Sequence, residues 1–204
     1  MPKRGFYDRE TIERILDEAL TCSIGIVDDG QPVVIPSFHV RVGDEVYVHG
    51  SSAGRTLRAL AGEAPACLTV MLLDGLVLAR SAFHHSLNYR SVVVFGSFDP
   101  VTDTDEKLHA LEALTEKLVP DRWEQIRHPT RQELKATSLV RIGLQEASAK
   151  VRTGQPDDEE DDYARQVWAG VVPTRLVRFP PDPDPRLSAG VPVPAALGSI
   201  VGSA

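Results

Sequence analysis

The order of apolar and polar positions over the first fifty residues predicts one helix followed by a β-meander. Apolar residues recur at helical spacing on one face of residues 8–20, and Asp8 can cap the first turn. The pattern then changes to short β-branched runs at 22–27, 33–42 and 45–49. Asp, Gly and Pro residues separate these runs, so we expect antiparallel strands joined by short hairpins.

The middle of the chain adds two helical patterns and three apolar runs. Helical spacing returns at 51–62 and at 103–118, where Asp103 can cap the helix. Three further strands are predicted, at residues 66–73, 91–98 and 138–145. The first is a nearly unbroken apolar run that ends at Asp74-Gly75, which predicts a fully buried strand. The third alternates and is predicted to be the last long strand.

The character of the chain changes after Lys150. Residues 157–162 form an acidic run that we expect to be solvated. Residues 174–179 are compatible with one further strand or helical turn. From residue 180 onwards Pro, Asp, Gly and Ala dominate. This composition predicts an extension that is poorly ordered or lies across the surface of a partner. We therefore expect a domain over residues 1–178 and a C-terminal extension over 179–204.

These elements together predict a mainly β protein with α additions. About six strands follow one another through hairpins rather than through βαβ crossovers. A small β-barrel fits this order, and a doubly wound sheet does not.

Composition narrows the class of protein. The chain has 204 residues, of which 42% are hydrophobic and 25% charged, and its formal charge is -7. That acidic balance argues against nucleic acid as a partner. Cys22 and Cys67 lack the spacing of a metal site or a disulfide framework, which suits a reducing cytosol. No signal peptide or membrane-spanning apolar run is recognisable, so we expect a cytoplasmic protein with no membrane partner.

Common nucleotide, zinc-protease and hydrolase motifs are absent, and polar clusters at predicted strand ends remain. The first cluster lies at a strand-to-helix junction and comprises His49, Gly50, Ser51, Ser52 and Arg55. Small residues, hydroxyl groups, a helix N-terminus and a guanidinium are suited to binding a phosphate. The alternative is that Ser52 only caps the helix.

Two further clusters have the same character. The second comprises Arg80, Ser81, Tyr89, Arg90 and Ser91, on either side of one loop. Its arginines either bind an anion or pair with the acidic excess of the chain. The third cluster is Lys150, at the end of the last strand, with Trp168 beyond it. A barrel would bring its strand ends together, which predicts a basic rim rich in hydroxyl groups.

The histidines and cysteines suggest no metal site. His84 and His85 are adjacent, so in an extended segment they would point to opposite sides. Both cysteines lie in apolar strand patterns and are predicted to be core residues. A Ser–His–Asp hydrolase could be assembled from Ser81, His85 and an aspartate, but nothing in the sequence fixes their order or geometry.

Several segments, in this order, resemble one protein family. They are Cys22–Gly25, Val46–Ser51, Cys67–Val70, Asp74–Phe83, His85–Val92, Glu146–Arg152 and Val167–Val171. The chain resembles the flavin-nucleotide-binding branch of the pyridoxamine 5'-phosphate oxidase-like split-barrel family, close to the nitroimidazole-resistance proteins. The resemblance covers about residues 5–175.

This resemblance implies a six-stranded split β-barrel that forms a homodimer, with FMN or occasionally FAD in each groove between subunits. The residues that match the family's cofactor groove are those of the three clusters: His49, Gly50, Ser51, Ser52, Arg55, Arg80, Ser81, Tyr89, Arg90, Ser91, Lys150 and Trp168. Of these, His49 matches a histidine implicated in chemistry. Replacement of Arg55 or Arg90 by alanine is then expected to weaken FMN binding by about 1.5–3 kcal/mol.

The leading function hypothesis is an FMN-dependent oxidoreductase that reduces a small acceptor, such as a nitro-aromatic or quinone-like compound, with NADH or NADPH as candidate donor. No second phosphate site supports pyridoxamine-phosphate oxidation. An alternative is a flavin carrier or haem-binding split barrel without turnover, for which His49, His84 and His85 are candidate ligands. A third hypothesis is a catalytically inactive interaction module whose function is to form its dimer.

Overall fold

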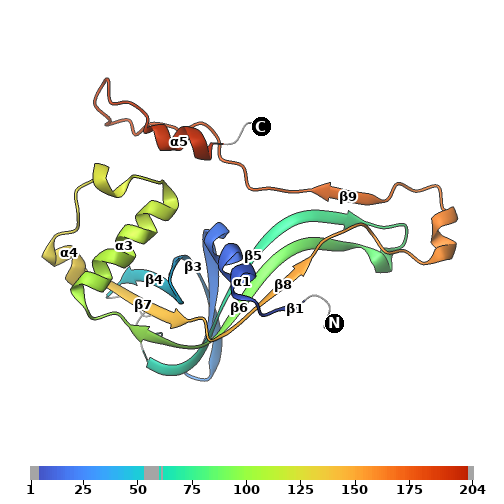
Figure 1. The fold of residues 1–204 in the computed structure, drawn as a ribbon, viewed down its shortest axis with the longest axis horizontal. Coiled ribbons are helices and arrows are strands. Elements are labelled where there is room, and N and C mark those ends of the chain that lie inside the picture. The colour runs from blue at the N-terminus through green and yellow to red at the C-terminus, as the bar shows by residue number, and fades with distance from the viewer. Residues whose placement is uncertain (1–4, 53–59, 61, 202–204) are drawn as a thin grey trace.

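A computed structural model describes residues 5–52, 60 and 62–201. Within these residues nine strands form one antiparallel sheet in the order β1-β8-β6-β7-β4-β3-β2-β5-β9 (Figure 1). The strands are β1 Gly5–Phe6, β2 Thr21–Asp28, β3 Gln31–Val42, β4 Glu45–Ser51, β5 Gly62–Leu78, β6 Ser86–Pro100, β7 Thr137–Gly143, β8 Glu146–Arg152 and β9 Gly170–Pro173. The helices are α1 Arg9–Glu18, α3 Thr104–Leu118, α4 Arg131–Ala136 and α5 Ala195–Ile200, with 3-10 turns η2 Ala82–His84, η3 Trp123–Gln125 and η4 Glu160–Ala164.

Six of these strands close into a ring. The pairs β2–β3, β3–β4, β4–β7 and β7–β6 run round one side, and β6–β5 and β5–β2 complete the circle. The β6–β7 seam is short, since it comprises only the pairs Asp99–Arg141 and Pro100–Val140. This arrangement confirms the predicted barrel-like β architecture, with consecutive strands joined mostly by hairpins.

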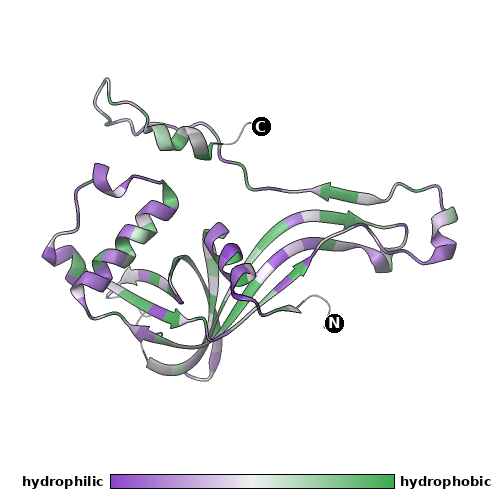
Figure 2. Ribbon diagram, viewed as in Figure 1, coloured by the Kyte–Doolittle hydropathy of each residue, from purple (hydrophilic) through white to green (hydrophobic). Residues whose placement is uncertain are grey.

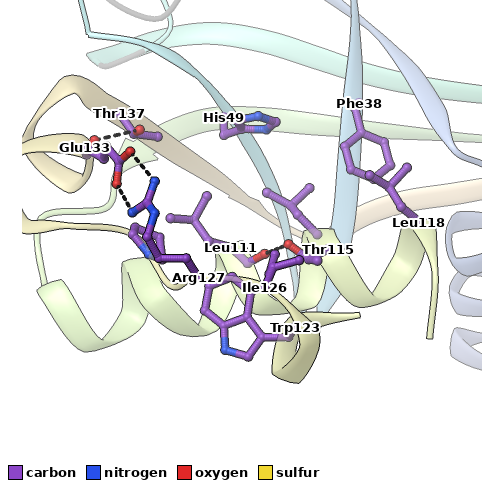
Figure 3. Close-up of a pocket in the computed structure, with 12 residues that line it drawn as sticks. Phe38, His49, Leu111, Thr115, Leu118, Trp123, Ile126, Arg127, Glu133 and Thr137 are labelled. Carbon is purple, nitrogen blue, oxygen red and sulfur yellow. Dashed lines mark hydrogen bonds and ion pairs between the residues drawn. The ribbon is translucent and has the colours of Figure 1, made fainter. Parts of the chain in front are cut away.

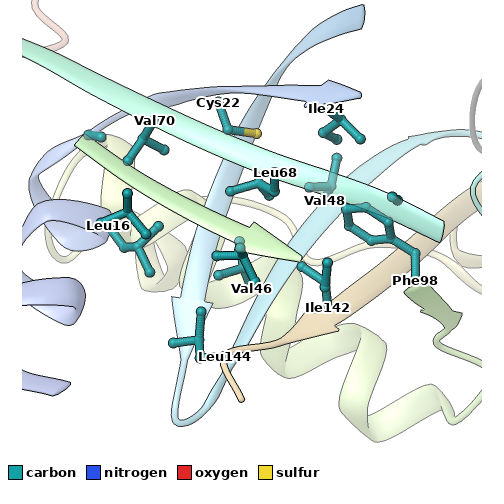
Figure 4. Packing of buried hydrophobic residues seen from close by; sticks show 14 of the residues in the cluster. Leu16, Cys22, Ile24, Val46, Val48, Leu68, Val70, Phe98, Ile142 and Leu144 are labelled. Atoms are coloured by element: carbon teal, nitrogen blue, oxygen red, sulfur yellow. The ribbon is translucent and has the colours of Figure 1, made fainter. Parts of the chain in front are cut away.

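The main core fills the inside of the ring. Figure 4 shows apolar side chains from opposite strands meeting there, among them Val46, Leu68, Phe98 and Ile142. Leu16 of α1 joins them, because the apolar face of this helix closes one end of the ring. Burial of each such side chain stabilises the fold by about 1.5–3 kcal/mol.

A second core lies outside the ring, where α3 packs on β3, β4 and β7. It contains Val40, Tyr47, Leu114 and Leu139. Glu106 of α3 accepts hydrogen bonds from the Tyr47 hydroxyl at 3.0 Å and from an Arg141 guanidinium nitrogen at 2.6 Å. One outer face of the barrel is therefore covered by a helix.

Both helix caps predicted from the sequence are present. The Asp8 carboxylate accepts from the Thr11 amide at 2.9 Å, and Asp103 accepts from the Glu106 amide at 2.8 Å. The helix expected over 51–62 falls largely outside the described residues.

Strand β5 departs from its prediction. It runs for 17 residues, continuing through Asp74-Gly75 with a register shift between Leu73 and Gly75. It is also not fully buried, because Met71 and Leu73 are 55% and 42% exposed. An unbroken apolar run predicts burial on both faces, whereas in β5 one face of the strand meets the core and the other is exposed.

The strand expected over 138–145 is present as β7, but it is not the last long strand, because β8 follows it. Strand β7 pairs with β4 and with the end of β6, whereas β8 pairs with the preceding part of β6 and with β1. A turn at Leu144-Gln145 sends the chain from one side of the ring to the other. Lys150 consequently lies within β8 rather than at a strand end.

The β5–β6 hairpin extends beyond the barrel, where β8 and β9 flank it (Figure 1). Residues 174–179 form neither a helix nor a strand, and the chain then leads to α5. Apolar residues continue along the extended strands (Figure 2). Among the described residues, no helix has the length and apolar character needed to cross a bilayer.

Candidate functional site

The first predicted cluster lies at the end of β4. His49, Gly50 and Ser51 oppose Leu139, Ser138 and Thr137 of β7, and the Ser52 amide donates to the Ala136 carbonyl at 3.0 Å. The cluster is therefore anchored beside the junction of α4 and β7. Arg55, the cation predicted to complete it, lies outside the described residues.

A cleft of about 350 Å³ opens beside His49 (Figure 3). Its walls come from β3, α3, η3 and α4, and the labelled side chains are Phe38, His49, Leu111, Thr115, Leu118, Trp123, Ile126, Arg127, Glu133 and Thr137. Arg127 and Glu133 form an ion pair at 2.8 Å. Partial burial lowers the pKa of His49, which favours the neutral imidazole. The cleft can therefore hold a small apolar molecule beside a neutral histidine. Its apolar walls were not singled out from the sequence.

The second place is the bare outer face of β5, β6 and β8. Ser91 opposes Met71 on one side and Lys150 on the other. The Ser91 hydroxyl donates to the Lys150 carbonyl at 3.4 Å, and the Lys150 ammonium lies 5.8 Å from the centre of the Tyr89 ring. The structure thus brings three predicted site residues together on one face, next to exposed apolar side chains.

Arg90 is adjacent to Ser91 in sequence but lies on the opposite side of β6. It opposes Leu72 and Val151, which both pack against the main core. Its guanidinium donates to Asp74 at 2.8 and 2.9 Å and also to Glu18. These two carboxylates raise the pKa of Arg90. The structure does not place Arg90 with Ser91, and its contact with a flavin phosphate stays a prediction.

The third place is the far end of the β5–β6 hairpin, where Arg80 is held by Asp158. The Asp158 carboxylate accepts from the Arg80 amide at 2.9 Å and from its guanidinium at 3.1 Å. The guanidinium also lies 4.7 Å from the centre of the Tyr163 ring. Asp158 is only 8% exposed. Burial raises its pKa, but hydrogen bonds from Arg80 and Ser81 outweigh that effect and leave the pKa lowered.

The expectation that residues 157–162 are simply solvated is therefore wrong for Asp158. Nothing in the local sequence distinguishes this carboxylate from its acidic neighbours. Its partner lies 78 positions earlier in the chain.

Ser81 and His85 are also in contact, though not as a hydrolase would need. The Nδ1 atom of His85 lies 2.8 Å from the Ser81 carbonyl oxygen. The Ser81 hydroxyl is buried and has no hydrogen-bond partner among the described residues. The contact between His85 and a backbone carbonyl does not make the serine a nucleophile.

Trp168 is 64% exposed, and its indole lies close against Gly170 at the start of β9.

Within one copy these places do not form one site. The β4 end and the hairpin end lie at opposite ends of the long dimension of the molecule (Figure 1). No group of three His, Cys, Asp or Glu side chains among the described residues could hold a metal ion.

The pyridoxamine 5'-phosphate oxidase family model matches residues 8–151 of the chain. That span includes the six strands of the ring, the helices between them and all but the last residue of β8. A search of curated proteins found no match.

Solved structures give two long and close similarities. The flavocytochrome Anf3 from Azotobacter vinelandii is 43% identical over 98% of this chain and 94% of its own, with a TM-score of 0.92. A FAD and heme binding protein from Mycobacterium smegmatis is 39% identical over 98% of both chains, with a TM-score of 0.93. Coverage of 98% extends past residue 178, so the similarity includes most of the C-terminal extension.

A more distant similarity supports the fold alone. A putative 5-nitroimidazole antibiotic resistance protein from Bacteroides thetaiotaomicron is 24% identical over 72% of this chain and 86% of its own, with a TM-score of 0.61.

Proposed function

The chain belongs to the pyridoxamine 5'-phosphate oxidase family, and from that premise we propose that it binds both FAD and haem, as a protein of the flavocytochrome type. The observation that carries this proposal is the pair of relatives that are 43% and 39% identical over nearly the whole chain. One is named a flavocytochrome and the other a FAD and heme binding protein. These relatives favour the haem-binding alternative over a protein that holds FMN alone.

The bare outer face fits a flavin. An isoalloxazine ring needs a flat apolar surface, and the phosphates need cationic or hydrogen-bonding donors. Met71 and Phe95 are 55% and 57% exposed on this face and can offer the apolar surface. Lys150 and Ser91, which lie beside them, can offer a charge and a hydroxyl group. Ser51 and Ser52 at the β4 end of a second copy could add hydroxyl groups for a phosphate.

The histidines fit a haem. Haem iron in proteins is commonly held by an imidazole nitrogen, and the macrocycle packs against apolar side chains. His49, His84 and His85 are all near the surface, next to apolar residues. When bound, a flavin accepts electrons in pairs or singly, and a haem accepts one electron at a time. The role of this chain is to hold the two groups and exclude water from them.

We also propose that two copies associate through the bare face. Seven large apolar side chains on the outer sides of neighbouring strands are each at least 38% exposed: Val27, Val34, Met71, Leu73, Leu76, Leu87 and Phe95. An apolar sheet surface of this kind is typical of an interaction site. A second copy would cover it and could bring the hairpin end of one chain towards the β4 end of the other.

Absorption spectroscopy tests the proposal directly. The protein is produced in cells supplied with a haem precursor and purified, and its spectrum is recorded. We expect flavin bands together with a Soret band, and mass spectrometry of the released flavin should identify FAD. A protein that neither retains nor takes up haem would refute the proposed haem binding. Release of FMN alone would favour the hypothesis of an FMN-dependent oxidoreductase instead.

Turnover is a second candidate function, and the cleft beside His49 favours it. A space of about 350 Å³ is at the lower end of the range for small-molecule sites, which suits a compact acceptor. Steady-state assays of the FAD-loaded protein with NADH or NADPH and a panel of nitro-aromatic and quinone-like compounds test this function. Absence of turnover with every pair would leave a binding or electron-carrying role.

A further inference from the structure

The six histidines of the chain differ in how far their ring nitrogens are free to bind a ligand. His39 is fully buried in the protein. The His84 ring lies 3.7 Å from a Glu159 carboxylate oxygen, and the His109 ring 4.0 Å from that of Glu112. His128 stacks on Trp123 at a centroid distance of 4.7 Å. His49 and His85 remain as histidines that can present a nitrogen to a large ligand.

His85 differs from His49 in being oriented. Its Nδ1 atom lies 2.8 Å from the Ser81 carbonyl oxygen, which can only accept a hydrogen bond. The proton of a neutral imidazole must therefore sit on Nδ1, which leaves the lone pair on Nε2. Metal-bound histidines in proteins almost always have this second hydrogen bond. Neither ring nitrogen of His49 has a hydrogen bond among the described residues.

The carbonyl that orients His85 is itself held in place. The buried carboxylate of Asp158 accepts hydrogen bonds from the Arg80 amide and guanidinium, and from the backbone of Ser81. The segment that carries the Ser81 carbonyl is thus fixed by a buried ion pair. The Ser81 carbonyl thus sets the tautomer and orientation of the exposed His85 ring, and Asp158 in turn holds the backbone that carries this carbonyl. An exposed histidine fixed in this way is suited to binding a metal ion through its other ring nitrogen.

The surroundings of His85 indicate the kind of ligand. Phe83, two residues earlier, is 90% exposed. Leu76 and Leu87 oppose each other across β5 and β6, each 38% exposed, and Val172 of β9 opposes Leu76. A large flat apolar group that needs one nitrogen ligand suits such a surface.

We propose that His85 would supply a nitrogen ligand to haem iron through Nε2, and that Asp158 positions this side chain through Arg80 and Ser81. This inference rests on the proposed haem binding and selects one histidine for it. Bond formation requires only donation of the Nε2 lone pair to the iron, so no proton or electron is transferred.

The test uses the full-length protein loaded with haem, with His85→Gly as the main variant. We expect haem affinity to fall by roughly a hundredfold and the histidine-type signals in electron paramagnetic resonance to disappear. Added imidazole should restore these signals, because it can occupy the space that the side chain leaves. Asp158→Asn, the positioning variant, should lower haem affinity by roughly tenfold while the histidine-type signals persist.

His109→Gln is the control, because His109 is an exposed side chain on α3, and we expect it to retain haem with unchanged signals. Unchanged flavin content and circular dichroism would show that the variants fold. Wild-type protein that binds no haem would refute the proposed function itself. Wild-type protein that binds haem, with His85→Gly still showing the same histidine ligand, would overturn the assignment of His85 alone.

Discussion

The carboxylate of Asp158 and the guanidinium of Arg80 form an ion pair at 3.1 Å across 78 positions of sequence. The pair ties the acidic segment that follows β8 to the end of β5. It also fixes the backbone from which the Ser81 carbonyl reaches His85. A contact at the far end of the hairpin therefore joins two segments that are distant in sequence.

Replacement of Asp158 by asparagine is expected to loosen this segment without unfolding the barrel. The amide of asparagine cannot balance the Arg80 guanidinium, which is left without its anion. Hydrogen–deuterium exchange should speed up in residues 153–164, whereas the barrel strands keep their protection. Asp161→Asn is the control, since Asp161 is exposed on the same segment. Equal protection in both variants would show that the ion pair does not hold the segment.

Arg90 is expected to matter for stability rather than for flavin affinity. Arg90→Gln removes the partner of Glu18 and Asp74, which lie where α1 meets the barrel. These side chains are partly exposed, so the loss should be about 1 kcal/mol in the free energy of unfolding, measured by urea denaturation.

Flavin titration distinguishes this expectation from the role predicted for Arg90 from the sequence. Arg90→Gln should leave the dissociation constant nearly unchanged, whereas Lys150→Ala should raise it by roughly tenfold. The matched pair is informative because the two residues lie on opposite sides of neighbouring strands. A large loss of affinity in Arg90→Gln with none in Lys150→Ala would place the flavin phosphates on the core side of β6.

Hydrophobic periodicity was sufficient for the barrel and two capped helices, because each depends on local chemistry. Asp8 and Asp103 cap the helices that follow them, and short turns join the first strands. The pairing of strands that are distant in sequence was harder to predict from the same pattern. The periodicity of residues 138–152 cannot reveal that the chain turns at Leu144-Gln145 and that its strands lie beside β4 before the turn and beside β1 after it, because either neighbour suits an alternating pattern.

The candidate site shows the same boundary between local and long-range information. Residue type singled out Ser91 and Lys150, which lie together on one face, and their contact with a flavin stays a prediction. It could not separate Arg90 from Ser91, because only the pleat of the strand sends them to opposite sides. It also missed the partnership of Asp158 with Arg80, which depends on the path of the chain between them.

The apolar outer face is expected to mediate dimer formation. Met71→Glu places a charge on this face, and the cost of burying an unpaired carboxylate should convert a dimer to a monomer. Light scattering coupled to gel filtration measures the change in mass. His109→Glu, an exposed substitution on α3, should leave the mass unchanged. A wild-type monomer, or a Met71→Glu protein that remains dimeric, would contradict the proposed interface.

Acid should weaken the fold through His39, which is fully buried between α1, β3 and α3. Its Nε2 atom lies 3.0 Å from the Leu16 carbonyl oxygen and 3.3 Å from the Lys117 ammonium. Burial and the Lys117 charge lower the pKa of His39 to about 4. Asp17 and the Leu16 carbonyl act in the opposite direction but are outweighed.

The sign of the effect follows from proton binding in the two states. Between pH 6.5 and pH 4 the unfolded chain binds a proton at His39 that the folded protein does not. The free energy of unfolding should therefore fall as the pH falls through this window, by an amount on the order of 3 kcal/mol. Burial also lowers the pKa of Lys117 to about 8, from 10.5, so the same reasoning makes stability rise with pH between these two values.

Urea denaturation at a series of pH values separates the two groups. His39→Gln should flatten the acid window and keep the alkaline one, because glutamine does not titrate and Lys117 remains. His109→Gln should retain both windows, since His109 is an exposed side chain on α3. If His39→Gln loses stability between pH 6.5 and pH 4 as steeply as the wild-type protein, His39 is not the source of the acid sensitivity.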